Sequence, residues 1–120
     1  MSTLGIIGEH NLQEKYLNLI KKGIKTVEGR INDGKFAEYK KGDIIKFVEN
    51  KNPQNFILCK IVRVHHYKTF EEMLQKEGLG RCLPVVKVIE EGVNIYRSFT
   101  GYIERERLHG VLAFTLSSME

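Results

Sequence analysis

The segment from Phe56 to Tyr67 restricts the possible folds of this chain more than any other part of it. It is long and almost continuously apolar, which predicts a strand buried within a sheet. A strand of this length does not stay flat, because strands that surround a core tilt and bend. The sequence therefore predicts a small curved sheet or barrel.

Further strands are predicted on both sides of this segment. Residues 3–8, 25–30 and 44–49 have the pattern of short strands. Residues 110–116 are apolar at consecutive positions, so both faces of that strand are covered and it lies centrally in the sheet.

Two helices are predicted from capping residues at their starts and glycines at their ends. Asn11 and Glu14 form a capping-box pattern for a helix that stops at Gly23. Thr69 begins a second helix in the same way, and Gly78 ends it. Both assignments rest on local backbone chemistry rather than on apolar content alone.

A third helix is predicted from Pro84, which suits a first helical turn. Its apolar stripe is predicted to pack in the core and consists of Val85, Val88, Ile89, Val93 and Tyr96. The sum is an α+β fold, a small mixed β-barrel of five or six strands with two or three packed helices. Without linkers or repeats, residues 1–120 are expected to form a single domain.

Composition excludes several classes of protein. The 120 residues are 42% hydrophobic and 28% charged, as in folded domains rather than disordered ones. No apolar run approaches the roughly 20 residues of a membrane span, and no signal peptide is recognisable. We therefore expect a cytoplasmic or nuclear protein in which Cys59 and Cys82 are buried thiols rather than a disulfide.

The net charge of +4 permits a polyanionic partner without requiring one. Basic residues gather in one part of the sequence, at Lys21, Lys22, Lys25, Arg30, Lys35, Lys40 and Lys41. This cluster indicates either a nucleic-acid surface or a solvated, lysine-rich face.

The most informative short segment is residues 23–30, Gly-Ile-Lys-Thr-Val-Glu-Gly-Arg. On a strand, Thr26, Glu28 and Arg30 share one face and Val27 points to the other. Lys25 directly precedes this polar row. The row fits a surface ion pair on an edge strand or a functional site, and the spacing alone leaves both open.

The same segment resembles the signature of ASCH domains, which have a PUA-like fold. The resemblance continues in order through four more segments, residues 41–45, 66–70, 90–99 and 110–114. It implies a barrel with packed helices and a cleft between them, lined by the Lys-Thr-x-Glu-x-Arg segment. For such a cleft we expect RNA or a modified nucleoside as the ligand.

Some ASCH members resemble amidohydrolases of acetylated cytidine, which use the motif lysine, a threonine three residues later and a distal glutamate. Lys25, Thr26 and Glu28 are the catalytic candidates that this comparison yields here. However, Glu28 occupies the threonine position, and the distal region has Glu77 and Arg81 without a secure counterpart. A carboxylate beside Lys25 favours the charged ammonium, so we expect no hydrolysis of N-acetylcytidine.

No metal site or other cofactor is predicted, because no His or Cys residues have ligand spacing. Arg81 follows two glycines, as phosphate-binding residues often do, although the lysine and serine of a P-loop are missing. Near the end of the chain, Tyr96 and Phe99 are expected to close the core. Arg97 and Tyr102 are expected at the cleft.

The favoured hypothesis is a small RNA-binding or modified-nucleotide-binding module without catalysis. Lys25, Arg30 and Arg97 would contact phosphate, Glu28 a base or ribose edge, and Tyr102 a base face. Two alternatives stay open. One is a hydrolase of a nucleoside or RNA, either an amidohydrolase or a nuclease, and the other is an adaptor that binds a protein partner.

Overall fold

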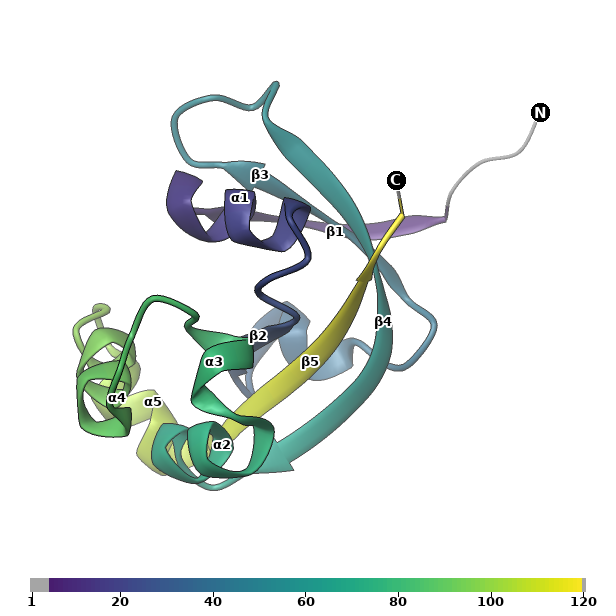
Figure 1. Ribbon diagram of the computed structural model, residues 1–120. Helices are drawn as coiled ribbons and strands as arrows, with labels where there is room; N and C mark the ends of the chain where they lie inside the picture. The colour runs from purple at the N-terminus through teal and green to yellow at the C-terminus, as the bar shows by residue number, and fades with distance from the viewer. Residues whose placement is uncertain (1–4, 120) are drawn as a thin grey trace.

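The computed structural model describes residues 5–119, and the strands of this part of the chain form one sheet (Figure 1). They are β1 (Ile6–Leu12), β2 (Val27–Ile31), β3 (Ile44–Glu49), β4 (Phe56–Tyr67) and β5 (Val111–Ser118). Their order in the sheet is β1-β3-β4-β5-β2. β1 runs parallel to β3, and the other neighbours are antiparallel.

The sheet is a curved half-barrel, which confirms the α+β class and the predicted strand number. β4 carries a register irregularity between Ile61 and Arg63, the kind of local disruption that lets a long strand bend. The first strand lies later in the sequence than expected, and residues 3 and 4 of that prediction lie outside the described residues. Within the described residues, the end strands β1 and β2 pair with β3 and β5 but not with each other.

The helices exceed the expected two or three. They are α1 (Glu14–Lys21), α2 (Phe70–Glu77), α3 (Leu79–Cys82), α4 (Ile89–Arg97) and α5 (Tyr102–His109), with a 3-10 turn η1 (Gly34–Glu38). In Figure 1, α1 lies against the end of the sheet near β1 and β3, and α2 to α5 lie together near the other end. None of the helices in residues 5–119 is long and apolar enough to cross a membrane.

The capping predictions differ in outcome. Asn11 does not cap α1, because it belongs to β1 and pairs with Val48, so the predicted capping box is wrong. Gly23 does follow the end of α1, with a left-handed φ of 75° that glycine adopts without strain. Thr69 caps α2 as predicted, since its Oγ1 accepts a hydrogen bond from the Glu72 N–H at 3.1 Å.

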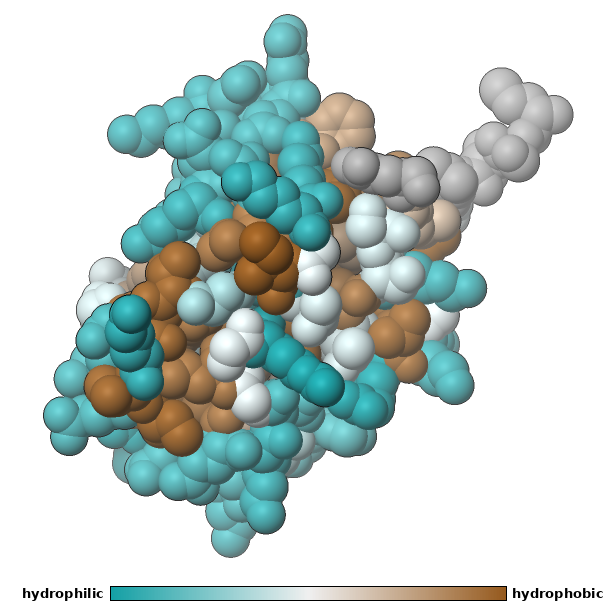
Figure 2. Space-filling view, viewed as in Figure 1, coloured by the Kyte–Doolittle hydropathy of each residue, from teal (hydrophilic) through white to brown (hydrophobic). Residues whose placement is uncertain are grey.

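The predicted third helix starts too early. Residues after Pro84 form a loop, and α4 begins only at Ile89. Val85 and Val88 are 61% and 55% exposed, and exposed apolar surface gathers over the connection between α3 and α4 (Figure 2). Closely spaced β-branched valines disfavour helix here, and of the three only Val86 is buried, so Val85 and Val88 gain no burial that would offset that cost.

α5 was not predicted because its sequence, YIERERLH, has no apolar stripe. Tyr102 at its start packs against the core, and ion pairs join the helix to other elements. Arg105 binds Asp33 through two parallel hydrogen bonds of 2.8 and 2.7 Å, a geometry that favours Arg over Lys. This pair ties α5 to the segment after β2.

Two hydrophobic clusters cover opposite faces of β5, which lies inside the sheet between β4 and β2. One contains Val111 and Ala113 with residues of α2 and α4, and the other contains Leu112 and Phe114 with residues of α1, β3 and β4. Cys82 lies in the first and Cys59 in the second, both buried as predicted. Burial raises the pKa of the Cys82 thiol to about 11, so it stays protonated at neutral pH.

Candidate functional site

A pocket of about 280 Å³ lies where the two end strands of the half-barrel approach each other. The end of β1, the middle of β2 and residues of α1, α4 and α5 surround it. Its lining residues are Asn11, Leu12, Gln13, Tyr16, Lys25, Glu28, Gly29, Arg30, Asn50, Leu83, Ile95, Tyr96, Phe99 and Tyr102. Charged groups from β2 and aromatic groups from the helices therefore meet at one concave surface.

Lys25, Glu28 and Arg30 form a chain of ion pairs along this pocket. Arg30 Nε donates to Glu28 Oε2 at 2.6 Å, and Lys25 Nζ lies 3.3 Å from Glu28 Oε1. The Glu28 side chain is 8% exposed, and a charge removed from water needs close partners. The predicted pairing of Glu28 with Arg30 is confirmed.

Glu28 is an ionised acceptor at neutral pH. Burial opposes its ionisation, but the charges of Lys25 and Arg30 outweigh burial and hold the pKa of the Glu28 carboxyl below its ordinary value of 4.5. An ionised carboxylate accepts hydrogen bonds and donates none. The pocket therefore presents a fixed negative group between two fixed positive ones.

Lys25 supports this carboxylate and is itself buried, with 3% exposure. An ammonium has three N–H donors, and three acceptors surround Lys25 Nζ. Besides Glu28, these are the carbonyl oxygens of Val27 and Cys82, each at 2.6 Å. This arrangement fits the charged form and leaves neither a free amine lone pair nor a spare donor for phosphate.

Arg30 extends beyond Glu28 to the opposite strand. Its Nη2 donates to the Asn11 carbonyl of β1 at 3.3 Å, and its guanidinium lies 4.5 Å above the centre of the Phe36 ring. His10 stacks on Phe36 at 4.0 Å. Burial, with the nearby Arg30 charge, lowers the pKa of His10 to about 4, so His10 adds no charge at neutral pH.

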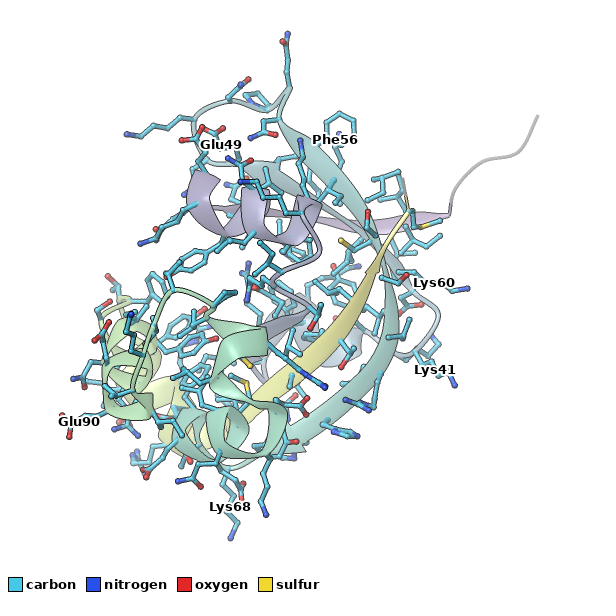
Figure 3. All side chains as sticks on the ribbon, in the orientation of Figure 1. Lys41, Glu49, Phe56, Lys60, Lys68 and Glu90 are labelled. Carbon is cyan, nitrogen blue, oxygen red and sulfur yellow. The ribbon has the colours of Figure 1, made fainter. Side chains whose placement is uncertain are left out.

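Four aromatic side chains line the pocket: Tyr16, Tyr96, Phe99 and Tyr102. Phe99 and Tyr102 contact edge-to-face with ring centres 5.2 Å apart. Tyr96 is buried as predicted, whereas Phe99 is 38% exposed and belongs to the pocket as well as to the helix surface. Figure 3 shows side chains filling the space between α1 and α4.

The Tyr96 hydroxyl is an exception to the hydrogen bonding of buried groups. Among the buried side-chain oxygen and nitrogen atoms of residues 5–119, it is the one that has no hydrogen-bond partner. Burial raises the pKa of Tyr96 well above 10, with the neighbouring Cys82 and Glu28 contributing. Such a group usually has a partner, so this hydroxyl has unused hydrogen-bonding capacity beside the pocket.

Two candidate residues near β2 do not line the pocket. Thr26 precedes β2, and its main chain is held by the Arg81 carbonyl on one side and the Leu116 N–H on the other. Lys25, not Thr26, reaches Glu28, because the alternation of a strand does not extend back beyond Val27. Arg81 is exposed on α3 and lies outside the pocket.

Arg97 also lies outside the pocket, and its ion pair explains why. Its Nε donates to Glu106 Oε1 at 2.8 Å, while Glu106 Oε2 accepts from the Phe70 N–H at 2.7 Å. The buried Glu106 carboxylate thus satisfies the N-terminus of α2 and joins it to α4 and α5. Arg97 has a structural partner that sequence spacing does not reveal.

The remaining candidates have other partners. Glu77 accepts from the Tyr67 hydroxyl at 2.6 Å and lies 3.0 Å from His65 Nδ1, so it does not supply the distal glutamate of an amidohydrolase. Lys41, a member of the basic cluster predicted from the sequence, projects outward from the surface (Figure 3). Residues 5–119 contain no group of three or more His, Cys, Asp or Glu side chains that could hold a metal ion.

Several lining residues were not identified from the sequence, among them Asn11, Gln13, Tyr16, Gly29 and Asn50. Gly29 stands within the recognised motif, which was a usable signal. The others come from β1, α1 and the turn after β3, and only the curvature of the sheet brings them to β2.

Two of the solved structures that this chain is similar to cover almost its whole length. The crystal structure of hypothetical protein PH0355 has 41% sequence identity and a TM-score of 0.82, covering 93% of this chain and 98% of that one. The NMR structure of protein PF0455 from Pyrococcus furiosus has 37% identity and a TM-score of 0.75, covering 95% and 99%. Comparison with curated proteins gives no significant match.

A match to a protein family agrees with the motif, the half-barrel and these two similar structures. The ASCH domain family matches residues 11–119, which include every strand that contributes to the pocket except the first residues of β1. The chain belongs to the ASCH domain family.

Proposed function

We propose that this domain binds a nucleobase of RNA, or a modified nucleoside, in the pocket between β1 and β2. The observation that carries the proposal is the buried, ionised Glu28 held between Lys25 and Arg30 beneath aromatic walls. A planar ligand with both hydrogen-bonding edges and apolar faces matches this combination.

The size of the pocket supports a small ligand. Its volume of about 280 Å³ is near the lower limit of about 300 Å³ for small-molecule pockets. One base, with or without its ribose, is of this scale, whereas a folded segment of RNA is not. A longer strand would contact the surface around the pocket.

The chemistry of the lining assigns a role to each group. Glu28 accepts from an N–H or O–H donor of the ligand, since it has lone pairs beyond those facing Lys25 and Arg30. Arg30 keeps further N–H groups for a carbonyl or phosphate oxygen after donating to Glu28 and Asn11. Tyr102 and Phe99 offer ring faces and edges, which stabilise bases without strict sequence preference.

Binding is favoured over hydrolysis because of the state of Lys25. All three ammonium donors have acceptors, so it is a poor base or nucleophile. Neither Thr26 nor Glu77 lines the pocket. An amidohydrolase of this kind needs a threonine and a distal glutamate beside the motif lysine, and these placements supply neither to the pocket.

The test is calorimetric titration of the protein with adenosine, cytidine, guanosine and uridine, and anisotropy with a fluorescein-labelled single-stranded RNA. We expect saturable binding of the RNA and of at least one nucleoside, weakened about tenfold or more by Glu28→Gln. Lys60→Ala, on the outer side of β4, is the control and should bind normally. Absence of binding to all five ligands would refute the proposal.

A further inference from the structure

The hydrogen-bond pattern of β2 shows which of its main-chain groups face the pocket. In an antiparallel pair, residues alternate between those bonded to the partner strand and those pointing away from it. The Leu116 N–H donates to the Thr26 carbonyl and the Asn32 N–H to the Gly110 carbonyl. Positions 26, 28, 30 and 32 therefore face the chain of β5, and 27, 29 and 31 face the open edge.

The three outward carbonyls of β2 are not equivalent. That of Val27 accepts from Lys25 Nζ at 2.6 Å, and that of Ile31 accepts from the Asp33 N–H at 2.9 Å. Between them, the N–H and C=O of Gly29 have no hydrogen-bond partner in residues 5–119. Gly29 is nevertheless buried and lines the pocket.

A buried peptide group without a partner is rare, because it loses its water without compensation. Here the unpaired Tyr96 hydroxyl lies at the same place. A Cβ atom on Gly29 would stand 3.1 Å from that hydroxyl and 2.7 Å from Met73 Cε. Three hydrogen-bonding groups, two on Gly29 and one on Tyr96, are thus left open within one small region of the pocket.

We infer that the main chain of Gly29 recognises the nucleobase, and we call it the reading edge of the pocket. The Gly29 N–H donates to an acceptor of the base, and the Gly29 C=O accepts from a donor of the base. This inference rests on the function proposed above and names the element that recognises the base. Every nucleobase carries adjacent donor and acceptor groups on one edge. The Glu28 carboxylate and the Tyr96 hydroxyl flank this edge and select among bases.

An extended peptide is the other ligand that uses an open strand edge. It needs successive outward residues whose N–H and C=O are both open, whereas β2 offers one such residue, Gly29, since the carbonyls of Val27 and Ile31 are occupied. Aromatic rings of α4 and α5 also enclose the edge. A flat ring with a single donor–acceptor pair fits these limits and a strand does not.

The test compares two substitutions that add the same Cβ atom. Gly29→Ala keeps the N–H, while Gly29→Pro removes it, and proline is tolerated where an edge strand has an outward N–H. We expect the nucleoside that binds the wild type best to bind Gly29→Pro at least about tenfold more weakly than Gly29→Ala. Equal affinities would overturn the inference.

A measurement on the wild type decides the question if Gly29→Pro does not fold. In ¹⁵N-labelled protein titrated with each of the four nucleosides, the Gly29 amide proton should move downfield and exchange more slowly with solvent. Binding that shifts Arg30 and Tyr102 signals but not Gly29 would refute the reading edge and leave the proposed function standing. No nucleoside or RNA binding would refute both.

A peptide arm separates the ligand classes. A blocked pentapeptide of alternating threonine and valine, added to the same labelled protein, should leave the Gly29 amide unchanged. A shift of Gly29 with this peptide, together with no shift with nucleosides, would assign the edge to a peptide and overturn the inference.

Discussion

Arg30 Nη2 of β2 donates a hydrogen bond to the Asn11 carbonyl of β1 at 3.3 Å. These strands lie at opposite ends of the sheet and share no main-chain pairing in the described residues. In a closed barrel, main-chain hydrogen bonds would join β1 to β2. Here the Arg30 side chain spans the gap between these two strands instead. The same guanidinium binds Glu28, so the opening and the charged floor of the pocket depend on one residue.

Arg30→Ala should weaken RNA binding and reduce its salt dependence. The guanidinium has N–H groups left for a phosphate or carbonyl oxygen, and each lost phosphate contact lowers the slope of log affinity against log salt by about one. Anisotropy between 50 and 300 mM salt measures both effects. Arg81→Ala removes the same group from an exposed site and should change neither; equal losses in both variants would assign the effect to overall charge.

Glu28 should make stability depend on pH below 4.5. Its pKa is lower in the folded protein than its ordinary value of 4.5, so its ionisation stabilises the fold fully above that value and less as the pH falls through the folded pKa. Thermal unfolding at pH 7 and pH 3 should show the wild type losing its advantage over Glu28→Gln. A difference in stability that stays constant over this range would contradict the coupling.

Replacing Glu28 should also destabilise the protein at neutral pH. Glu28→Gln leaves the buried Lys25 ammonium without its charged partner, and breaking a buried pair in this way costs about 3–5 kcal/mol. Urea unfolding measures the loss. The double variant Lys25→Met, Glu28→Gln should recover part of it, and failure to recover any would show that the lysine is not the source.

Arg97→Ala should lower stability without affecting nucleoside binding. The substitution leaves Glu106 Oε1 without its charged partner while Phe70 N–H stays on Oε2, a loss of about 1–3 kcal/mol. Urea unfolding and calorimetric titration separate the two properties. If Arg97→Ala instead reduced nucleoside affinity and left stability unchanged, Arg97 would be a ligand-binding residue rather than a structural one.

Tyr96→Phe should stabilise the free protein and weaken its complex. The hydroxyl is buried without a partner, so removing it relieves a desolvation cost of about 1 kcal/mol. A ligand that bonds to the hydroxyl loses that bond in the variant. Melting temperatures with and without the best-binding nucleoside test both effects, and an unchanged ligand-induced shift would exclude contact with Tyr96.

The protein should not release cytidine from N-acetylcytidine. Lys25 has an acceptor for each ammonium donor, and no lone pair is available for attack or proton abstraction. Chromatography after prolonged incubation gives the result. Turnover that disappears in Lys25→Ala would favour the hydrolase alternative.

Local patterns predicted β3 and β4 within the observed bounds, because alternation and apolar runs are written in consecutive residues. The Glu28–Arg30 pair was predictable for the same reason, since two residues apart on a strand share a face. α5 was not predictable, because Arg105 and Asp33 are distant in sequence and no stripe marks the helix. Arg97 was expected at the pocket but lies outside it, because charge alone does not distinguish a ligand contact from a partner for a buried carboxylate.

The pocket itself lay beyond sequence reasoning. Tyr16 and Asn50 reach it only through the curvature of the half-barrel, and curvature depends on how β4 bends near Ile61. Gly29 was visible in the motif, but its open main-chain groups follow from the pairing register with β5. Register is a property of two strands and cannot be read from one.

The pairing of β2 with β5 also fixes when the pocket can form during synthesis. Val27 pairs with Thr115 and Ile31 with Val111. β2 therefore cannot pair in the sheet until residues some 80 positions later in the sequence have been synthesised. Until residues 111–115 have left the ribosome, β2 has no neighbour in the sheet and Gly29 has no fixed orientation. A nascent chain that stops before residue 111 therefore carries the recognised motif without the neighbouring strand that orients it, and the pocket takes shape only once β5 has been made.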